Sequence, residues 1–292
     1  MVNAEITTTD PAAPRTFRRA VLRHLSPTGL LGAAVVLCTV VAALLAPVIA
    51  PHAPSAQDIT RRLQPPSWMG GPPRFFLGTD LLGRDVLSRV IFGVRVSMLV
   101  GVCAVLVSGT IGVLLGLAAG YFGGWVDAAV MRVGDVQLGI PFLVLAIALV
   151  AVVGPGLLNI IAVLGVTGWV MYGRIVRAEV LSVREKEFVE AARATGSPDY
   201  KIIHRHILPN VAASIIVVAT LEVPRMIVAE ASLSFLGLGV QPPTPTWGGM
   251  VADGRDYVAT GWWLAAFPGL AVIVTVLGIN LLGDWLRDVL DP

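Results

Sequence analysis

The residues that could carry out chemistry are few, and their spacing fits no common catalytic or metal-binding pattern. All four histidines lie in polar segments, and His204 and His206 stand two residues apart, so they do not share a helix face. No His-Glu-x-x-His pattern occurs, and a protease acting inside a membrane would need its serine and histidine there. Neither Lys186 nor Lys201 follows a glycine, as a phosphate-binding P-loop requires. The sequence therefore predicts no catalytic residues, no metal site and no nucleotide bound by this chain.

The composition indicates the environment of the chain. Of its 292 residues, 55% are hydrophobic and only 14% are charged, whereas a soluble domain has about 25% charged residues. The formal net charge of +2 offers no basic surface for nucleic acid. We therefore predict an all-α polytopic membrane protein.

Long uncharged stretches predict six membrane-spanning helices, because about 20 apolar residues are needed to cross the hydrocarbon layer. Gly154, Pro155 and Gly156 read as a turn between the third and fourth spans. The predicted spans are residues 29–50, 96–120, 136–153, 157–172, 210–231 and 264–282.

The basic residues predict the orientation, because cytoplasmic loops carry an excess of lysine and arginine. With the N-terminal segment 1–28 inside, 13 basic residues fall on the cytoplasmic side and seven outside. Both termini are then cytoplasmic. The outer segment 51–95 is rich in arginine, and its part 79–95 is amphipathic. We interpret 79–95 as an interfacial helix; the alternative is an N-terminal extension of the second span.

The segment 173–208 predicts a helix, a sharp turn and a second short helix. Gly196 can end the first helix in the left-handed conformation. Ser197 is a good N-cap and Pro198 a good first helical residue, while Pro209 disfavours helical geometry at Leu208. The periodicity favours two interpretations equally: a docking element for a soluble partner, or a solvated helical hairpin that covers the bundle.

Two features inside the spans also indicate function. Glu222 and Arg225 lie three residues apart in the fifth span, so they can pair on one face, and ionisable residues at this depth are costly. They line a pathway or contact a partner subunit, and the second is slightly favoured. The glycines at 112, 116 and 120 form a ridge for close helix packing, for which a contact within the same bundle is favoured over one between subunits.

The segment 173–208 also carries a recognisable motif. Glu190, Ala191 and Ala192 are followed by three residues, Gly196 and, farther on, Leu208 and Pro209. This pattern resembles the signature loop of binding-protein-dependent ABC importer permeases, although His206 stands where the motif has isoleucine. Four further stretches resemble the second, or C-type, permease of the dipeptide/oligopeptide branch: residues 77–89, 230–239, 242–248 and 283–292.

The resemblance implies a fold and a set of partners. The fold is that of type I ABC importers, with six transmembrane helices and a cytoplasmic coupling loop. The implied partners are a second homologous permease, two ATP-binding cassette ATPases that use ATP and Mg²⁺, an extracytoplasmic solute-binding protein and a peptide substrate. The location is a bacterial plasma membrane. A nickel or other small-solute permease is the alternative within the family, and an ion-coupled secondary transporter is the alternative from another class.

The resemblance also implies roles for named residues. The Glu190–Gly196 segment would sit in a groove of one ATPase, with Leu208 and Pro209 completing the motif. Glu230, like Glu222 and Arg225 on the grounds given above, is a candidate for the pathway or for a contact with the other permease. Trp247 and Arg255, in the predicted outer loop, would help to dock the solute-binding protein.

Overall fold

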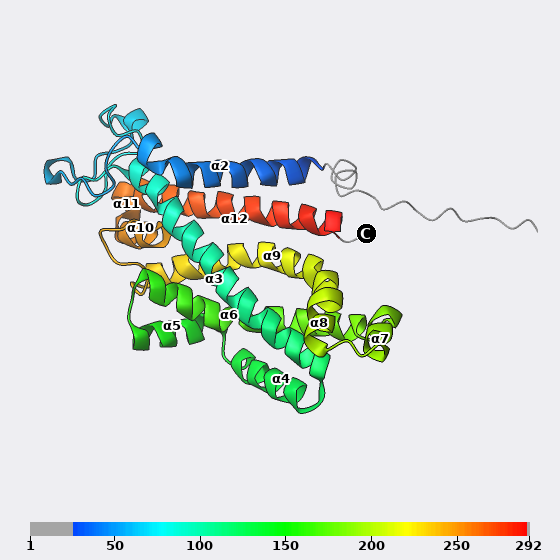
Figure 1. Ribbon diagram of the computed structural model, residues 1–292. Helices are drawn as coiled ribbons and strands as arrows, with labels where there is room; N and C mark the ends of the chain where they lie inside the picture. Colours follow the sequence, from blue (N-terminus) through cyan, green and yellow to red (C-terminus); the bar gives the residue numbers. More distant parts are fainter. Residues whose placement is uncertain (1–25, 291–292) are drawn as a thin grey trace, which may run out of the picture.

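The computed structural model describes residues 26–290, and this part of the chain is helical apart from its loops (Figure 1). A lone bridge between Thr79 and Asp85 is the one β pairing among these residues. The predicted cytoplasmic segment 1–28 lies almost entirely outside the described range. The helices are α2 (Pro27–Ile49), α3 (Val86–Phe122), α4 (Gly124–Leu138), α5 (Phe142–Val153), α6 (Leu157–Val183), α7 (Glu187–Ala194), α8 (Asp199–Ile202), α9 (Leu208–Phe235), α10 (Trp247–Gly254), α11 (Val258–Gly261) and α12 (Trp263–Leu290).

Within residues 26–290, five helical segments are long and apolar enough to cross a membrane: α2, α3, α6, the continuous α8–α9 segment and α12. A sixth crossing would require α4 and α5 together, which meet at a bend of 89°. The predicted third span, 136–153, is therefore wrong as a single helix. Pro141 disfavours helical geometry at Ile140 and has no N–H to donate, so α4 ends at Leu138 and α5 begins after the proline.

The interfacial helix predicted over 79–95 is also wrong. Residues 79–85 form a tight turn, and α3 runs without a break from Val86 into the second predicted span. The side chain of Asp85 accepts a hydrogen bond from the Ser88 N–H at 2.9 Å and so caps the helix at this point. The N-terminal extension of the second span, which we weighed as the alternative, is what the structure contains.

The glycine ridge packs inside the bundle, as favoured from the sequence. Helix α3 makes its most extensive contact with α6. A Cβ on Gly112 would lie 2.4 Å from the carbonyl oxygen of Trp169, and one on Gly116 would lie 2.8 Å from that of Gly173. The two helices can approach this closely only because these side chains are absent.

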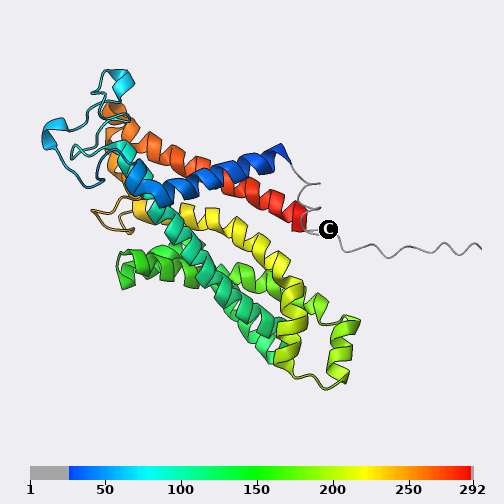
Figure 2. The ribbon, with the colours of Figure 1, turned by 45° about the horizontal axis from the view of Figure 1, so that its top comes forward.

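The residues predicted to dock partner proteins lie at two opposite ends of the molecule. We call the end that carries residues 50–85 and α10 the loop end, and the end that carries α7 and α8 the α7 end. Both views place these ends far apart, with α2, α9 and α12 running between them (Figures 1 and 2). Helix α6 continues to Val183, so residues 173–183, predicted as loop, belong to the bundle.

Candidate functional site

The turn after α7 is built around one glycine. Gly196 has a φ of +76°, in the left-handed region. Its N–H donates to the Arg193 carbonyl at 3.0 Å, and the Ser197 N–H donates to the Ala192 carbonyl at 3.1 Å. These two bonds form a Schellman motif, which ends a helix sharply. No atom lies within 4 Å of the place that a Cβ on Gly196 would occupy, so the backbone, and not packing, requires glycine here.

The connection from this turn to α9 differs from the prediction in two details. Helix α8 begins at Asp199 with Pro198 as its cap, and Ser197 makes no capping bond. Leu208 is helical, with φ −53° and ψ −44°. Residues Ile203–Ile207 form a π-helical turn in which the Leu208 N–H donates five residues back, to Ile203. This wider turn accommodates Pro209, which falls in the first turn of α9, where its missing N–H costs least.

Buried contacts hold α7 and α8 on the bundle. Val189 on α7 is fully buried and packs with Ile202, Ile207 and the last turns of α6. The Tyr121 hydroxyl, at the end of α3, donates to the Asp199 carboxylate at 2.6 Å. This arrangement fixes the position of α7 relative to the long helices.

The motif residues themselves lie largely at the surface of this fixed element. Glu190, Ala191 and Gly196 are exposed, and Ala192 is half-buried. At the start of α9, Leu208 is half-buried and Pro209 exposed. The α7 end therefore presents a small-residue surface on a rigid support, which is the property that a docking element requires.

The charged residues of α9 pair within the chain, as their spacing predicts. Arg225 Nη1 donates to both carboxylate oxygens of Glu222 at 3.0 Å. The Glu222 side chain is 7% exposed and that of Arg225 is 41% exposed. The Arg225 guanidinium also lies 4.3 Å from the ring centroid of Phe142 on α5. The pair thus joins α9 to the start of α5 and leaves one side of the arginine accessible.

Glu230, the other predicted acid of α9, is fully buried and connects α9 to α3. Ser97 Oγ of α3 donates to one carboxylate oxygen at 3.0 Å, and Ser234 Oγ donates to the other at 2.7 Å. Ser234 also packs closely against Gly239, and a Cβ atom on Gly239 would overlap the Ser234 side chain. Glu230 therefore acts through Ser234 on the loop that follows α9.

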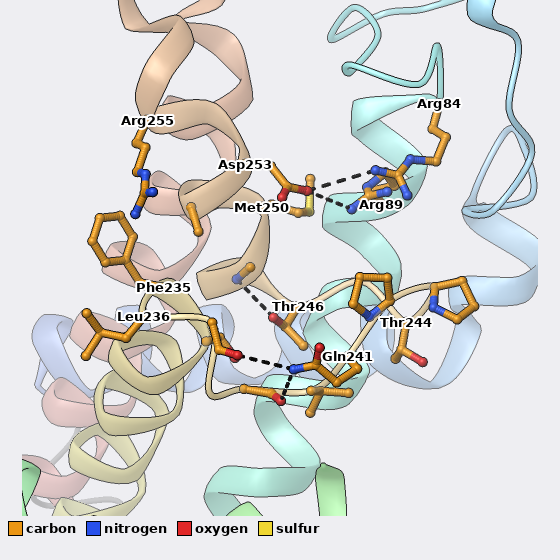
Figure 3. A pocket seen from close by; sticks show the side chains of 18 residues that line it. Arg84, Arg89, Phe235, Leu236, Gln241, Thr244, Thr246, Met250, Asp253 and Arg255 are labelled. Atoms are coloured by element: carbon orange, nitrogen blue, oxygen red, sulfur yellow. Dashed lines mark hydrogen bonds and ion pairs between the residues drawn. The ribbon is translucent and has the colours of Figure 1, made fainter. Parts of the chain in front are cut away.

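The two residues predicted for an outer docking loop have different surroundings. Trp247 is 1% exposed, and its Nε1 donates to the Val90 carbonyl of α3 at 3.0 Å. The prediction that Trp247 forms a docking contact is wrong, because its ring is used to pack α10 on α3. Arg255 is exposed and lies 5.8 Å from the ring centroid of Phe235. It borders a cavity of about 370 Å³ lined by the loop after α9 (Figure 3).

A charge network in the wall of this cavity, buried except for Asp253, was not identified from the sequence. Asp80 Oδ2 lies 2.6 Å from Arg84 Nε and 3.2 Å from Arg89 Nη1. Asp253 of α10 points toward both guanidinium groups, 3.6 Å from Arg89 and 3.9 Å from Arg84 (Figure 3). The i,i+4 spacing of Asp80 and Arg84 was an available signal, but Asp253 lies too far along the chain for its part to be read. The network joins the loop before α3 to α10.

Comparison with known protein families identifies the class of this chain. Residues 112–292 match the family described as binding-protein-dependent transport system inner membrane component. Residues 18–66 match the N-terminal TM domain of oligopeptide transport permease C. The chain belongs to this family of multi-pass inner membrane components, which sets aside the protease and secondary-transporter alternatives.

Curated relatives match nearly the whole chain. It is 46% identical to the di/tripeptide transport system permease protein DppC of Pseudomonas aeruginosa, over 88% of this chain and 85% of that protein. It is 40% identical to the probable D,D-dipeptide transport system permease protein DdpC of Escherichia coli, over 100% of this chain and 97% of that protein. The inward-facing MetNI methionine ABC transporter contains a chain with a TM-score of 0.56 at 21% identity, covering 70% of this chain and 96% of that one. The last likeness confirms the predicted importer-permease fold.

Proposed function

We propose that this chain forms one half of the translocation pathway of an ATP-driven importer of di- or oligopeptides. The observation that carries this proposal is its identity of 40–46% to dipeptide and di/tripeptide permeases over most of both chains. The nickel or small-solute alternative has no comparable support among these relatives. In this function the chain hydrolyses nothing itself; separate ATPase subunits use ATP and Mg²⁺, and a second permease completes the pathway.

The function assigns a side of the membrane to each end. The α7 end would face the cytoplasm, together with both termini, in agreement with the excess of basic residues there. One ATPase would bind the exposed surface of Glu190, Ala191, Ala192 and Gly196. The loop end would face outward, and Arg255, at the rim of its cavity, remains the candidate contact for a solute-binding protein.

The structure supports a mechanical role for the exposed turn. Val189 and the Tyr121–Asp199 hydrogen bond hold α7 and α8 to α3 and α6, so a force applied to α7 would act on whole helices. Such rigid-body displacement is a common way of switching between two states. Glu222 and Arg225 would lie beside the pathway or the second permease.

The test is uptake of a labelled dipeptide by cells that lack other peptide importers and express this chain with its neighbouring genes. We expect uptake that requires both this chain and an active ATPase subunit. Labelled Ni²⁺, offered to the same cells, provides the comparison. Uptake of Ni²⁺ without uptake of peptides would assign the chain to the alternative substrate class.

A further inference from the structure

One arginine of the apolar helices has no partner among the residues that the structure describes. Arg95 lies on α3 and is exposed, and its side chain makes no ion pair or hydrogen bond with any of residues 26–290. A cation among apolar side chains is costly if hydrocarbon surrounds it, so it is expected to have a partner. Since residues 26–290 do not supply a partner for Arg95, we look for that partner outside these residues.

The surroundings of Arg95 form an apolar groove between α2 and α3. The groove has a volume of about 560 Å³ and ends at Thr244 and Pro245. Its walls include Val40 and Leu44 of α2 and Leu99 and Val102 of α3, which are between 37% and 71% exposed. Among the described residues, Arg95 is the one charged side chain that lines it.

The direction of α3 places the guanidinium near one membrane surface. Side chains on a helix lean toward its N-terminus, and α3 begins at the loop end, so Arg95 leans toward that end. The facing residues Val40 and Leu44 stand nine and five residues before the end of α2 at Ile49. At about 1.5 Å per residue, they lie roughly 8–13 Å from that end. A long arginine side chain can reach the headgroup layer from this depth by snorkelling.

We propose that this groove binds an anionic phospholipid of the leaflet at the loop end, with its phosphate on Arg95 and an acyl chain between α2 and α3. A net anion is required because Arg95 has no counter-charge, whereas a zwitterionic headgroup brings its own cation. A lipid phosphate already lies at the correct depth.

The proposal is tested with the full-length chain, purified in detergent together with its co-expressed subunits and stripped of lipid. The complex is then titrated with phosphatidylglycerol or with phosphatidylcholine of identical acyl chains. Native mass spectrometry counts the bound lipids. We expect wild type to prefer phosphatidylglycerol, and Arg95→Gln to weaken that binding about fivefold, the contribution of one basic side chain near an anionic surface. Arg95→Lys should retain most of it, and Leu44→Trp, which narrows the groove, should weaken both lipids.

The matched control is Arg132→Gln, which removes the same charge from an exposed position on α4. It should leave lipid binding unchanged. All variants are compared at equal helical content and equal elution volume, so that misfolding is recognised. Equal phosphatidylglycerol affinity in wild type and Arg95→Gln overturns the proposal. So does a variant that binds lipid normally but loses another membrane subunit, because the groove would then be a protein interface.

Discussion

Substitutions at Gly196 should change the conformation of the turn after α7 without changing the rest of the fold. A φ of +76° costs an L-residue about 1–2 kcal/mol, which corresponds to about a 5–30-fold change in an equilibrium constant. Because no atom lies within 4 Å of the added Cβ, the cost of Gly196→Ala is purely conformational. Gly196→Asn should cost less, since asparagine adopts this region more readily.

Gly196→Pro should be the most severe variant of the series. Proline fixes φ near −65° and has no N–H for the 3.0 Å bond to the Arg193 carbonyl, so the Schellman motif cannot form. We expect transport rates in the order wild type, Asn, Ala, Pro, with no transport by the proline variant.

The assay for this series combines dipeptide uptake, the amount of chain in the membrane and the amount of ATPase that copurifies. Because α7 and α8 lie at one end of the bundle, insertion should be equal in all variants. The reasoning would be refuted if Gly196→Pro transported at the wild-type rate and retained its ATPase. A uniform loss of membrane insertion across the series would contradict the claim that the turn acts locally.

Three further predictions concern the bundle. Gly112→Val should lower stability in detergent by about 1–3 kcal/mol through overpacking against α6. Gly269→Ala, where no atom lies within 4 Å of an added Cβ, is the control and should not melt earlier. Glu230→Leu should leave two buried serine hydroxyls without their acceptor and lower the free energy of unfolding by about 1–3 kcal/mol. The loop after α9 should then be cleaved faster by a protease. Glu230→Gln should lower stability less, and equal cleavage of the two variants would contradict the role of the carboxylate. Cysteines replacing Glu222 and Arg225 should react with aqueous thiol reagents if the pair borders the pathway, whereas complete protection would indicate a subunit contact.

Local sequence signals predicted the features that depend on local physics. The long apolar stretches predicted the membrane-spanning helices, because the mean hydropathy of a stretch depends only on residues that are neighbours in the sequence. The glycine turn was recognisable because the left-handed conformation and the end of α7 involve consecutive residues. The Glu222–Arg225 pair followed from helical spacing alone.

The remaining features depend on contacts between distant segments. Nothing near Trp247 in the sequence shows that its ring is buried against Val90, 157 residues away. The bend between α4 and α5 lies within one uncharged stretch, so hydropathy could not locate it, although Pro141 was a visible signal. Helix α3 begins where the Asp85 side chain caps it. The amphipathic pattern over 79–95 indicated an earlier start, so the sequence prediction placed the helix boundary wrongly.

The continuous helical segment from Asp199 to Phe235 has a thermodynamic consequence. It is 37 residues long, or about 55 Å along its axis at 1.5 Å per residue. It begins beside the exposed turn of α7 and ends at the wall of the cavity at the loop end (Figures 1 and 3). When both ends of one such segment bind ligands, linkage makes their effects reciprocal. If a ligand at the cavity and a partner at the α7 surface both bind one position of the segment more tightly, each raises the affinity of the other by the same factor. Occupancy outside can then be measured as a binding constant inside.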